Sequence, residues 1–364
     1  MFNQVSIIGV GLIGGSIGLG LRARGLARTV TGVGRDPSRL QEALARGAVD
    51  HFTTDPQTGL AGAELVVIAV PVASIIPVLR LVVPHLRPGT IVTDVGSCKA
   101  AVVDAAARIT PAGVHFVGGH PMAGSEQAGI GGADRYLFEG AYYVLTPTPH
   151  TDRRASARVR LMAEGLGCRV IEMTPGEHDR AVAAVSHLPH LLACTLVNTV
   201  AGMEGSERAL ALAAGGYRDT TRVAAGSPPM WLDIFLANRG MLKALLHRFR
   251  EELNVIEGAL DEGGAEEITA WLQKARESRE GLPARAKGYL KDLHEITITI
   301  SDRPGTIATV ASLLGRHEIN ISDLEILRVR EGEGGTVRLA FGAARDRDRA
   351  AELLAGEGIP VTRH

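Results

Sequence analysis

The chain has 364 residues, of which 45% are hydrophobic and 22% are charged, and this length predicts two or three domains and excludes a single small binding module. Lysine and arginine together number 39, against 40 for aspartate and glutamate, so the charge gives no reason to expect a nucleic-acid partner or a membrane surface. We therefore expect a small ligand. The 44 glycines follow no collagen-like period, which predicts tight turns and close backbone approaches.

The cysteines and the most apolar segments bear on the compartment. Cys98, Cys168 and Cys194 form no CxxC pair, which favours a reducing, cytoplasmic location. The N-terminal sequence MFNQVSIIGVG has neither a basic stretch nor a small-residue cleavage site, so no export signal is expected. Residues 65–86 are strongly apolar, but three prolines and Arg80 interrupt them. We predict a buried strand, a turn and a helix there, and no membrane span.

The first half of the chain alternates short apolar runs with helical segments. Runs rich in β-branched residues, which predict strands, lie at residues 5–8, 30–33, 65–70, 91–94, 115–117 and 142–145. Helical patterns lie between them, as at residues 38–46 and 99–108. Continuous apolar strands separated by helices are typical of βαβ units around a parallel sheet. We predict a doubly wound α/β domain over residues 1–175.

The second half of the chain changes pattern twice. Beyond residue 175 the strand signal disappears, and helical patterns cover residues 187–203 and 230–279, which predicts an all-helical domain over residues 176–288. Its apolar stripes exceed what one small layer would cover, so we expect a homodimer through this domain. Strands are then predicted at residues 295–300, 321–330, 336–341 and 360–362, and helices at 306–317 and 346–355. This order predicts a ferredoxin-like βαββαβ domain over residues 294–364.

A glycine motif lies directly after the first predicted strand. In the sequence GVGLIG, Gly9 suits a tight turn, Gly11 allows the backbone to approach a pyrophosphate, and Gly14 allows close helix packing. The helix that begins at Leu12 and Ile13 would direct its N-terminus at the anion. The alternative is a purely structural glycine turn, but the strand before it and the helix after it favour a Rossmann-type dinucleotide site.

The choice of cofactor depends on the end of the second strand, where an acidic residue would bind the ribose of NAD. Gly34 occupies that position and Arg35 follows it, an arrangement suited to the 2′-phosphate of NADP. The alternative is that Asp36 reaches the ribose and Arg35 is a surface charge, so NAD stays open. We also assign Val70, Pro71 and Asp94, at the ends of later strands, to the cofactor site.

Three polar clusters predict the chemistry. His120 lies in GGHPMAGSE after the strand at 115–117 and is the candidate general base, because imidazole titrates near neutral pH. The segments SHLPH and GGYRDTTR follow in the helical region, so two domains would face one crevice. SHLPH could hold a metal, but no second pair at zinc spacing accompanies it, and we predict none. A structural histidine and arginines paired on a helix surface are the alternatives.

These segments resemble the prephenate dehydrogenase family of tyrosine biosynthesis. The resemblance covers residues 3–285 and depends on seven motifs, GVGLIGGS, TDVGSCKA, VGGHPMAGSEQAG, LTPT, SHLPH, GGYRDTTRVA and PPMWLDIF. It implies oxidative decarboxylation of prephenate to 4-hydroxyphenylpyruvate, with hydride transfer to NAD(P)+. The tail resembles an ACT domain, a regulatory module that binds amino acids.

The resemblance also implies residue roles. His120 would accept the proton of the prephenate C4 hydroxyl, with support from Ser97, and catalytic His190 would orient the pyruvyl end. Arg222 would pair with a substrate carboxylate, a role suited to its bidentate guanidinium. The other residues implied to contact or surround the substrate are Ser125, Glu126, Ser186, Asp219 and Trp231.

In the tail, the resemblance implies L-tyrosine as an effector. It would bind near Asp302, Gly305, Asn320 and Ile321. The alternative is a domain that only reinforces the dimer.

Other functions stay open on the sequence. Arogenate dehydrogenase, which carries out the same reaction on the amino analogue, is the nearest, and the Gly34-Arg35 pair favours it through NADP use. A β-hydroxyacid dehydrogenase would need a catalytic lysine in the helical part, and the lysines after Lys99 do not fit that role. A non-enzymatic NAD(P) sensor is the third alternative.

Overall fold

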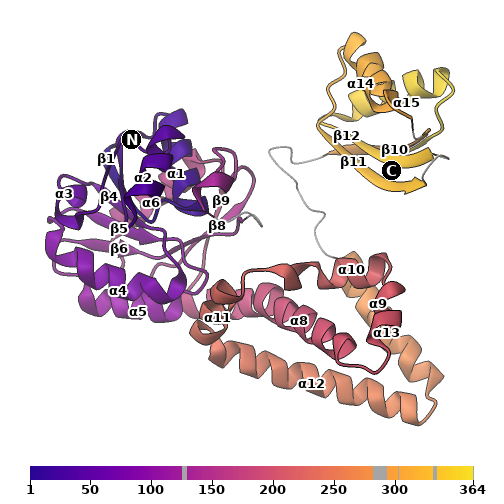
Figure 1. Cartoon of the computed structure of the whole chain (residues 1–364), viewed down its shortest axis with the longest axis horizontal. Helices are drawn as coiled ribbons and strands as arrows, with labels where there is room; N and C mark the ends of the chain where they lie inside the picture. The colour runs from indigo at the N-terminus through magenta and orange to yellow at the C-terminus, as the bar shows by residue number, and fades with distance from the viewer. Residues whose placement is uncertain (125–128, 282–292, 302, 331–333, 364) are drawn as a thin grey trace. The chain divides into compact units, whose positions relative to one another are not determined.

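The computed structural model (Figure 1) describes residues 1–124, 129–281, 293–301, 303–330 and 334–363. Side chains are described for these residues except 327–330, 334 and 363. The chain divides into two compact units, Met1–Leu282 and Pro283–His364. The first unit contains an α/β part followed by a helical part, and the second is a small α+β unit.

A six-stranded parallel sheet forms the centre of the α/β part. Its strands are β1 (Phe2–Ile8), β2 (Ala27–Val33), β3 (His51–Thr53), β4 (Leu65–Ile68), β5 (Ile91–Asp94) and β6 (His115–Val117). Their order is β3-β2-β1-β4-β5-β6, and every neighbouring pair is parallel. This order reverses direction between β1 and β4, and a doubly wound sheet binds its ligand at that point. The predicted doubly wound fold is confirmed.

Helices cover both faces of this sheet. They are α1 (Leu12–Ala23), α2 (Pro37–Ala45), α3 (Pro56–Leu60), α4 (Val72–Val82), the 3-10 turn η1 (Val83–His85), α5 (Ala100–Ile109) and α6 (Arg153–Gly165). Adjacent residues of β1 point to opposite faces, so Ile7 joins one apolar core with Ile17 while Ile8 joins a second core with Ile75. The apolar segment 65–86 is a strand, a turn and a helix, as predicted.

A second, three-stranded sheet corrects one expectation. Its strands are β7 (Gly119–Pro121), β8 (Tyr142–Leu145) and β9 (Arg169–Glu172). We expected residues 142–145 in the parallel sheet, but β8 pairs antiparallel with β7 and parallel with β9. The reason is that the chain leaves β6 at Gly118, whose carbonyl accepts a hydrogen bond from the Thr146 N–H. His120 therefore lies within its own strand, opposite Val144, and not at the end of the strand at 115–117.

The helical part of the first unit contains no strand among its described residues. Its elements are α7 (Pro175–Val182), a π-helical segment (Ala183–His187), α8 (Leu188–Ala201), α9 (Ser206–Ala211), α10 (Gly215–Thr221), η4 (Arg222–Ala225), α11 (Pro228–Ala237), α12 (Arg239–Asp261) and α13 (Ala265–Glu280). The helical stretch predicted at 230–279 is divided into three helices, because the chain turns at Asn238 and at Gly263, where φ is +66°.

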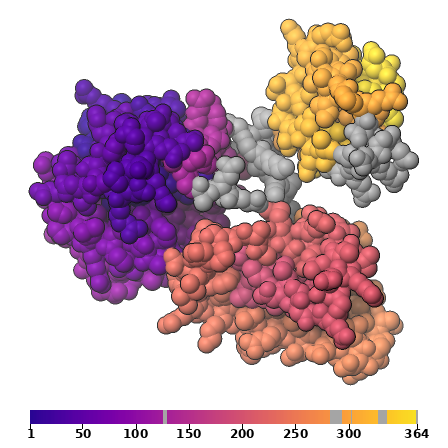
Figure 2. Space-filling model, viewed as in Figure 1, coloured from indigo at the N-terminus to yellow at the C-terminus, as the bar shows by residue number. Residues whose placement is uncertain are grey.

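Most side chains of the last two helices of this part, α12 and α13, are not buried. The orange surface of the first unit in Figure 2 belongs largely to α12 and α13, and Leu242 is the buried residue of α12, while α13 has none. By length and composition alone, one helical run of the described chain, Pro175–Ala201, could cross a membrane. That run comprises α7, the π-helical segment and α8.

The second unit is a four-stranded antiparallel sheet with two helices. Its elements are β10 (His294–Ile300), α14 (Thr306–Arg316), β11 (Asp323–Arg330), β12 (Gly334–Phe341), α15 (Ala344–Gly356) and β13 (Val361–Arg363). The strand order is β11-β12-β10-β13. Ile296 and Ile298 of β10 are fully buried with Leu314, Leu339 and Phe341. The predicted βαββαβ plait is confirmed.

Candidate active site

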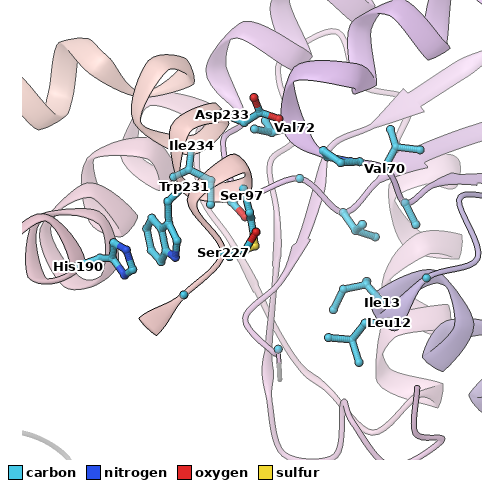
Figure 3. Close-up of a pocket in the computed structure, with 18 of the residues that line it drawn as sticks. Leu12, Ile13, Val70, Val72, Ser97, His190, Ser227, Trp231, Asp233 and Ile234 are labelled. Carbon is cyan, nitrogen blue, oxygen red and sulfur yellow. The ribbon is translucent and has the colours of Figure 1, made fainter. Parts of the chain in front are cut away.

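A cavity of about 900 Å³ opens between the α/β part and the helical part of the first unit (Figure 3). The α/β part contributes the turns after β1, β4 and β5, and the helical part contributes α8, η4 and α11. The predicted site residues that line the cavity are Gly11, Leu12, Ile13, Val70, Pro71, Ser97, His190, Arg222 and Trp231. The cavity lies where the sheet order reverses, so a ligand there would touch both parts.

The three motif glycines have different surroundings. A Cβ on Gly9, whose φ is +91°, would lie 2.5 Å from the Ala69 carbonyl oxygen, and one on Gly14 would lie 2.1 Å from the Gly9 oxygen. A Cβ on Gly11, by contrast, would meet nothing within 4 Å. Gly11 precedes α1, whose first turn has no side-chain cap. The free N–H groups and the open space above Gly11 fit the pyrophosphate of a dinucleotide.

The residues of the turn after β2, Gly34, Arg35 and Asp36, are not among those that line the cavity. Asp36 caps α2, because its Oδ1 accepts hydrogen bonds from the Ser38 and Arg39 N–H groups at 2.9 and 3.4 Å. Arg35 precedes it and is exposed. The Asp36 carboxylate is therefore engaged at the helix N-terminus.

The helical side of the cavity is aromatic. His190 and Trp231 stack with their ring centroids 3.6 Å apart and an angle of 11° between the planes (Figure 3). A Cβ on Gly226 would lie 2.7 Å from Trp231 Nε1, so this close approach requires glycine. His190 is buried, and among the described residues its Nδ1 has no hydrogen-bond partner. Burial lowers the pKa of His190, which favours a neutral ring at neutral pH.

Arg222 is the cationic side chain that the helical part contributes to the cavity lining. It is the first residue of η4 and its side chain is exposed. Asp233 of α11 also lines the cavity, and the sequence reasoning did not select it. Ser186 and Asp219, which the resemblance implied near the substrate, do not line this cavity. Ser125 and Glu126 lie outside the described residues.

A buried ion pair lies beneath the cavity. Asp94 and Lys99 are both fully buried and bonded to each other. Asp94 also accepts hydrogen bonds from the N–H groups of Gly96, at 2.9 Å, and Gly119, at 3.3 Å, while Lys99 Nζ donates to the Gly119 carbonyl at 2.8 Å. We predicted that Asp94 contacts the cofactor, but its carboxylate points inward. Its contacts instead hold the loop that bears Ser97 against the strand that bears His120.

His120 is partly buried, and it is not among the residues that line the cavity. Its Nδ1 lies 2.8 Å from His178 Nε2, and His178 Nδ1 lies 2.8 Å from Asp179 Oδ1. Burial is the main cause that lowers the pKa of His120 well below 6.5, and repulsion from His178, Lys99 and His187 adds to it. His120 therefore stays neutral at neutral pH, as a proton acceptor must.

The sequence reasoning missed His178 and Asp179. They are adjacent in α7, and His178 lies 58 positions after His120, a separation that matches no motif spacing. The signal available in the sequence is an adjacent His-Asp pair near the predicted start of the helical region, and the structure adds that both side chains are buried. Buried polar side chains of this kind are usually hydrogen-bonded to each other.

The residue that follows Ser97 is a cysteine, but it is not a nucleophile. Cys98 is buried, and burial raises the pKa of its thiol to about 12. The thiol therefore stays protonated at neutral pH. Among the described residues, no three histidine, cysteine, aspartate or glutamate side chains come together as metal ligands.

The second unit has a small cavity of about 70 Å³. Its lining residues are Ile300, Ser301, Arg303, Thr306, Ile307, Ile326, Gly335 and Val337. Of the four residues predicted to bind an effector, Gly305 begins α14 with φ at +91°, and Asn320 and Ile321 precede β11. None of these three lines the cavity, and Asp302 lies outside the described residues.

Comparisons with known families cover nearly the whole chain. Residues 17–172 match the family model for the prephenate dehydrogenase nucleotide-binding domain, and residues 174–274 match that for the prephenate dehydrogenase dimerization domain. Residues 294–356 match the ACT domain model.

Individual relatives agree with these matches. The chain is 33% identical to prephenate dehydrogenase from Bacillus subtilis, over 97% of this chain and 96% of that protein. It is 32% identical to cyclohexadienyl dehydrogenase from Zymomonas mobilis, over 78% of this chain and 97% of the relative.

Two solved structures are similar over most of the chain. The structure of prephenate dehydrogenase from A. aeolicus with hydroxyphenyl propionate and NAD+ is 32% identical, with a TM-score of 0.73, and covers 77% of this chain and 98% of that one. The structure of Synechocystis arogenate dehydrogenase is 35% identical, with a TM-score of 0.69, over 76% and 99%. The chain therefore belongs to the prephenate dehydrogenase family of NAD(P)-dependent oxidoreductases, and it carries a C-terminal ACT domain.

Proposed function

We propose that this enzyme oxidatively decarboxylates prephenate to 4-hydroxyphenylpyruvate. The observation that carries the proposal is the single cavity that has a glycine turn at one end and Arg222, His190 and Ser97 at the other. Prephenate is a dianion with a reactive ring between two carboxylate-bearing arms. The lining combines the Arg222 cation with the Asp233 carboxylate and neutral polar groups, and a few placed groups of this kind suit such a ligand better than a broadly basic surface.

The cofactor end would be held mainly by the main chain. The N–H groups at the start of α1 would bind the pyrophosphate above Gly11, and Val70 and Pro71 would line the nicotinamide end. When bound, the cofactor accepts the hydride from C4 of the substrate ring. The role of this part of the chain is to position that ring next to C4.

Side chains of the protein would transfer the C4 hydroxyl proton and pair with the substrate carboxylates. His120 accepts the proton of the C4 hydroxyl as C4 loses hydride and becomes a carbonyl carbon. The bond from C1 to the carboxylate then breaks, carbon dioxide leaves, and its electron pair passes through the ring to the oxygen on C4. That oxygen takes a proton back from His120, which yields the phenol. Ser97 would support His120, and Arg222 would pair with a carboxylate throughout.

Arogenate is the second candidate substrate. His190 supports its consideration, because it lines the cavity and a neutral imidazole has one donor and one acceptor nitrogen, so it could donate to the keto oxygen of prephenate or accept from the ammonium of arogenate. The solved relatives include both a prephenate and an arogenate dehydrogenase.

We propose NADP ahead of NAD as the cofactor. Gly34 has no side chain to bind a ribose hydroxyl, Asp36 is engaged as a helix cap, and exposed Arg35 is available to a 2′-phosphate. NAD+ is the cofactor bound in the A. aeolicus relative, so the two cofactors must be compared directly.

We propose a homodimer through the helical part. The exposed large apolar side chains on α8, α11, α12 and α13 include Leu196, Leu232, Leu236, Leu253, Val255, Leu260 and Leu272. An apolar surface of this kind is costly in a monomer and is typical of an oligomer interface. We expect a dimer in sedimentation at micromolar concentration, and a monomer there would contradict this proposal.

We propose L-tyrosine as the effector of the ACT domain. The tight turn at Gly305 and the start of α14 support a binding site for an amino acid carboxylate. Tyrosine should inhibit the full chain but not a chain truncated after Gly281. Inhibition of both would assign tyrosine to the active site, and inhibition of neither would leave the ACT domain without this role.

One steady-state experiment tests the proposed substrate, cofactor and effector together. Initial rates are measured with prephenate and with arogenate, each with NAD and with NADP, in the absence and presence of tyrosine. We expect the highest kcat/KM for prephenate with NADP. Absence of turnover with both substrates, alongside tight cofactor binding, would favour a sensor over an enzyme.

A further inference from the structure

His120 is the first member of a chain of three side chains that extends into the protein. Its Nδ1 lies 2.8 Å from Nε2 of His178, which is fully buried, and Nδ1 of His178 lies 2.8 Å from Oδ1 of Asp179. The sequence separation between the two histidines is 58 residues. This contact therefore depends on how α7 packs against β7, and not on any local motif.

The contacts of Asp179 determine which atom is the donor in the hydrogen bond between His178 and Asp179. Its two oxygens accept hydrogen bonds from the N–H groups of Lys99, at 2.7 Å, and Ala100, at 2.9 Å. Burial acts to raise the pKa of Asp179, but the hydrogen bonds from His178, Lys99 and Ala100 outweigh it, so the pKa is lowered. Asp179 is therefore an anion that can only accept, and Nδ1 of His178 must be the donor.

The direction of the hydrogen bond between His178 and Asp179 fixes the direction of the one between His120 and His178. When the two histidines share no extra proton, Nε2 of His178 has a lone pair and accepts a hydrogen bond. Nδ1 of His120 must then be the protonated nitrogen. Nε2 of His120 is left with its lone pair, which is the form that a general base requires.

We propose that His178 and Asp179 are positioning residues that fix His120 in the tautomer with a free Nε2. This inference rests on the proposed role of His120 in proton transfer. When Nε2 takes the substrate proton, the hydrogen bond from His120 to His178 becomes charge-assisted, with the Asp179 anion behind it. These hydrogen bonds are thus stronger when His120 is protonated than when it is neutral, and this difference accelerates the reaction.

The other charged or titratable groups near His120 are Lys99, Asp94 and His187. Lys99 and Asp94 are paired with each other. Burial is the main cause that lowers the pKa of His187, to about 4, so His187 is neutral at neutral pH. Asp179 is therefore the anion that reaches His120 through a hydrogen-bonded side chain.

A purely structural role for Asp179 is the competing explanation. Its bonds to the N–H groups of Lys99 and Ala100 lie at the start of α5, where a carboxylate stabilises a helix. A cap changes thermal stability and does not require His178. A positioning pair changes kcat and the tautomer of His120, so the two explanations differ in what they affect.

Four variants separate them. His178→Leu removes the acceptor opposite His120, while His178→Gln keeps an amide oxygen that can accept from Nδ1. Asp179→Asn removes the negative charge that fixes His178 as the donor, so His120 should no longer be held in the tautomer with a free Nε2. His51→Gln, at an exposed position on β3, is the matched control. Each variant is measured for kcat, KM, cofactor affinity and Tm in the full chain.

The tautomer is observed without turnover. Long-range ¹H–¹⁵N spectra of protein labelled at its 12 histidines identify the His120 signals by their absence from His120→Asn. We expect Nδ1 protonated and Nε2 free in the wild type and in His178→Gln, and a mixture of the two tautomers in Asp179→Asn. This reading holds even if the enzyme does not turn over prephenate, so failure of the proposed function is seen separately.

The kinetic expectations follow from the size of general-base effects. His178→Leu and Asp179→Asn should each lower kcat by about a hundredfold or more with little change in KM, and His178→Gln should stay within about tenfold of wild type. A wild-type His120 with Nε2 protonated, or a His178→Leu variant with wild-type kcat, would overturn the proposal. If His178→Leu does not fold, the spectra and the contrast between His178→Gln and Asp179→Asn decide.

Discussion

The two ends of the candidate active site use different groups of the protein, the main chain at the cofactor end and side chains at the reactive end. At the cofactor end, the ligand would meet main-chain N–H groups above Gly11, in space that exists because side chains are missing. At the reactive end, side chains are held by other side chains, as His120 is by His178 and His190 is by Trp231. The comparison teaches that the first end depends on local backbone geometry, while the second depends on contacts between distant segments.

The two ends differ in how far their functional groups are buried. The cofactor end keeps its helix N-terminus open, so that an anion can be bound there. At the reactive end, burial lowers the pKa values of His120, His187 and His190. Substitutions at the first end should therefore change binding or packing, whereas those at the second should change rate and pH dependence.

The largest effect is expected at His120. His120→Asn keeps a polar side chain but cannot accept the substrate proton, so kcat should fall by about 10²- to 10⁴-fold. Cofactor affinity, measured by the quenching of NADPH fluorescence, should stay unchanged because the cofactor would be held at the start of α1 and not by His120. If kcat is retained across neutral pH, the reactive end does not depend on this imidazole and the comparison fails.

The pH dependence of stability tests the burial of histidine at the reactive end. Because the pKa of His187 in the folded protein is about 4 against an ordinary value of 6.5, the unfolded chain takes up a proton first as the pH falls. The contribution of His187 to stability is therefore full above pH 6.5 and is lost towards pH 4, by about 3 kcal/mol in all.

The measurement is urea unfolding at several pH values for wild type and His187→Gln. The difference between the two curves isolates His187 from the carboxylates, which titrate in both proteins. Glutamine can still bond to Asn238, whose amide lies 3.2 Å from His187 Nδ1. Parallel curves from pH 7.5 to 4.5 would mean that His187 does not resist protonation in the fold.

At the cofactor end, two glycines should respond differently to the same substitution. Gly14→Ala inserts a Cβ 2.1 Å from the Gly9 oxygen, so it should destabilise the fold by about 1–3 kcal/mol. Gly11→Ala has open space and should leave Tm unchanged, while it weakens cofactor binding by occupying the pyrophosphate position. Equal losses of Tm in both variants would show that Gly11 is a packing residue, and the contrast between the two ends would be weaker.

The smallest effect is expected at Arg35. Because the side chain is exposed, a charge pair with a 2′-phosphate is screened by water and should change the ratio of kcat/KM for NADP and NAD by less than about tenfold on Arg35→Ala. Arg39→Ala, which removes a neighbouring exposed cation paired with Asp36, is the matched control. An unaltered ratio in Arg35→Ala would remove Arg35 as the source of cofactor preference.

The parts of this protein that were predictable from sequence have local causes. The glycine turn follows from GVGLIG between an apolar strand and a helix, and the βαββαβ tail follows from alternation in HEITITI and the segments after it. Each of these features requires only neighbouring residues. The antiparallel pairing of β7 with β8 was missed because it depends on Gly118 bonding to Thr146, which no short window contains.

The candidate site divides in the same way. Ser97, His190, Arg222 and Trp231 were selected through motifs, and the structure places them in one cavity. The pairing of His178 with His120 and of Asp179 with Lys99 spans 58 and 80 residues. The burial of Asp94 was likewise not visible in the sequence, because its hydrogen bond from the Gly119 N–H joins segments that are distant along the chain.

The buried carboxylate of Asp94 has a consequence for how the site opens. It accepts the amide protons of both Gly96 and Gly119, so releasing either amide means disturbing an anion that has no access to water. The two loops should therefore open together, in one rare event, and not independently. In hydrogen exchange, the amides of Gly96 and Gly119 would share one opening free energy, and the loop that bears Ser97 and the strand that bears His120 would act as a single mechanical unit.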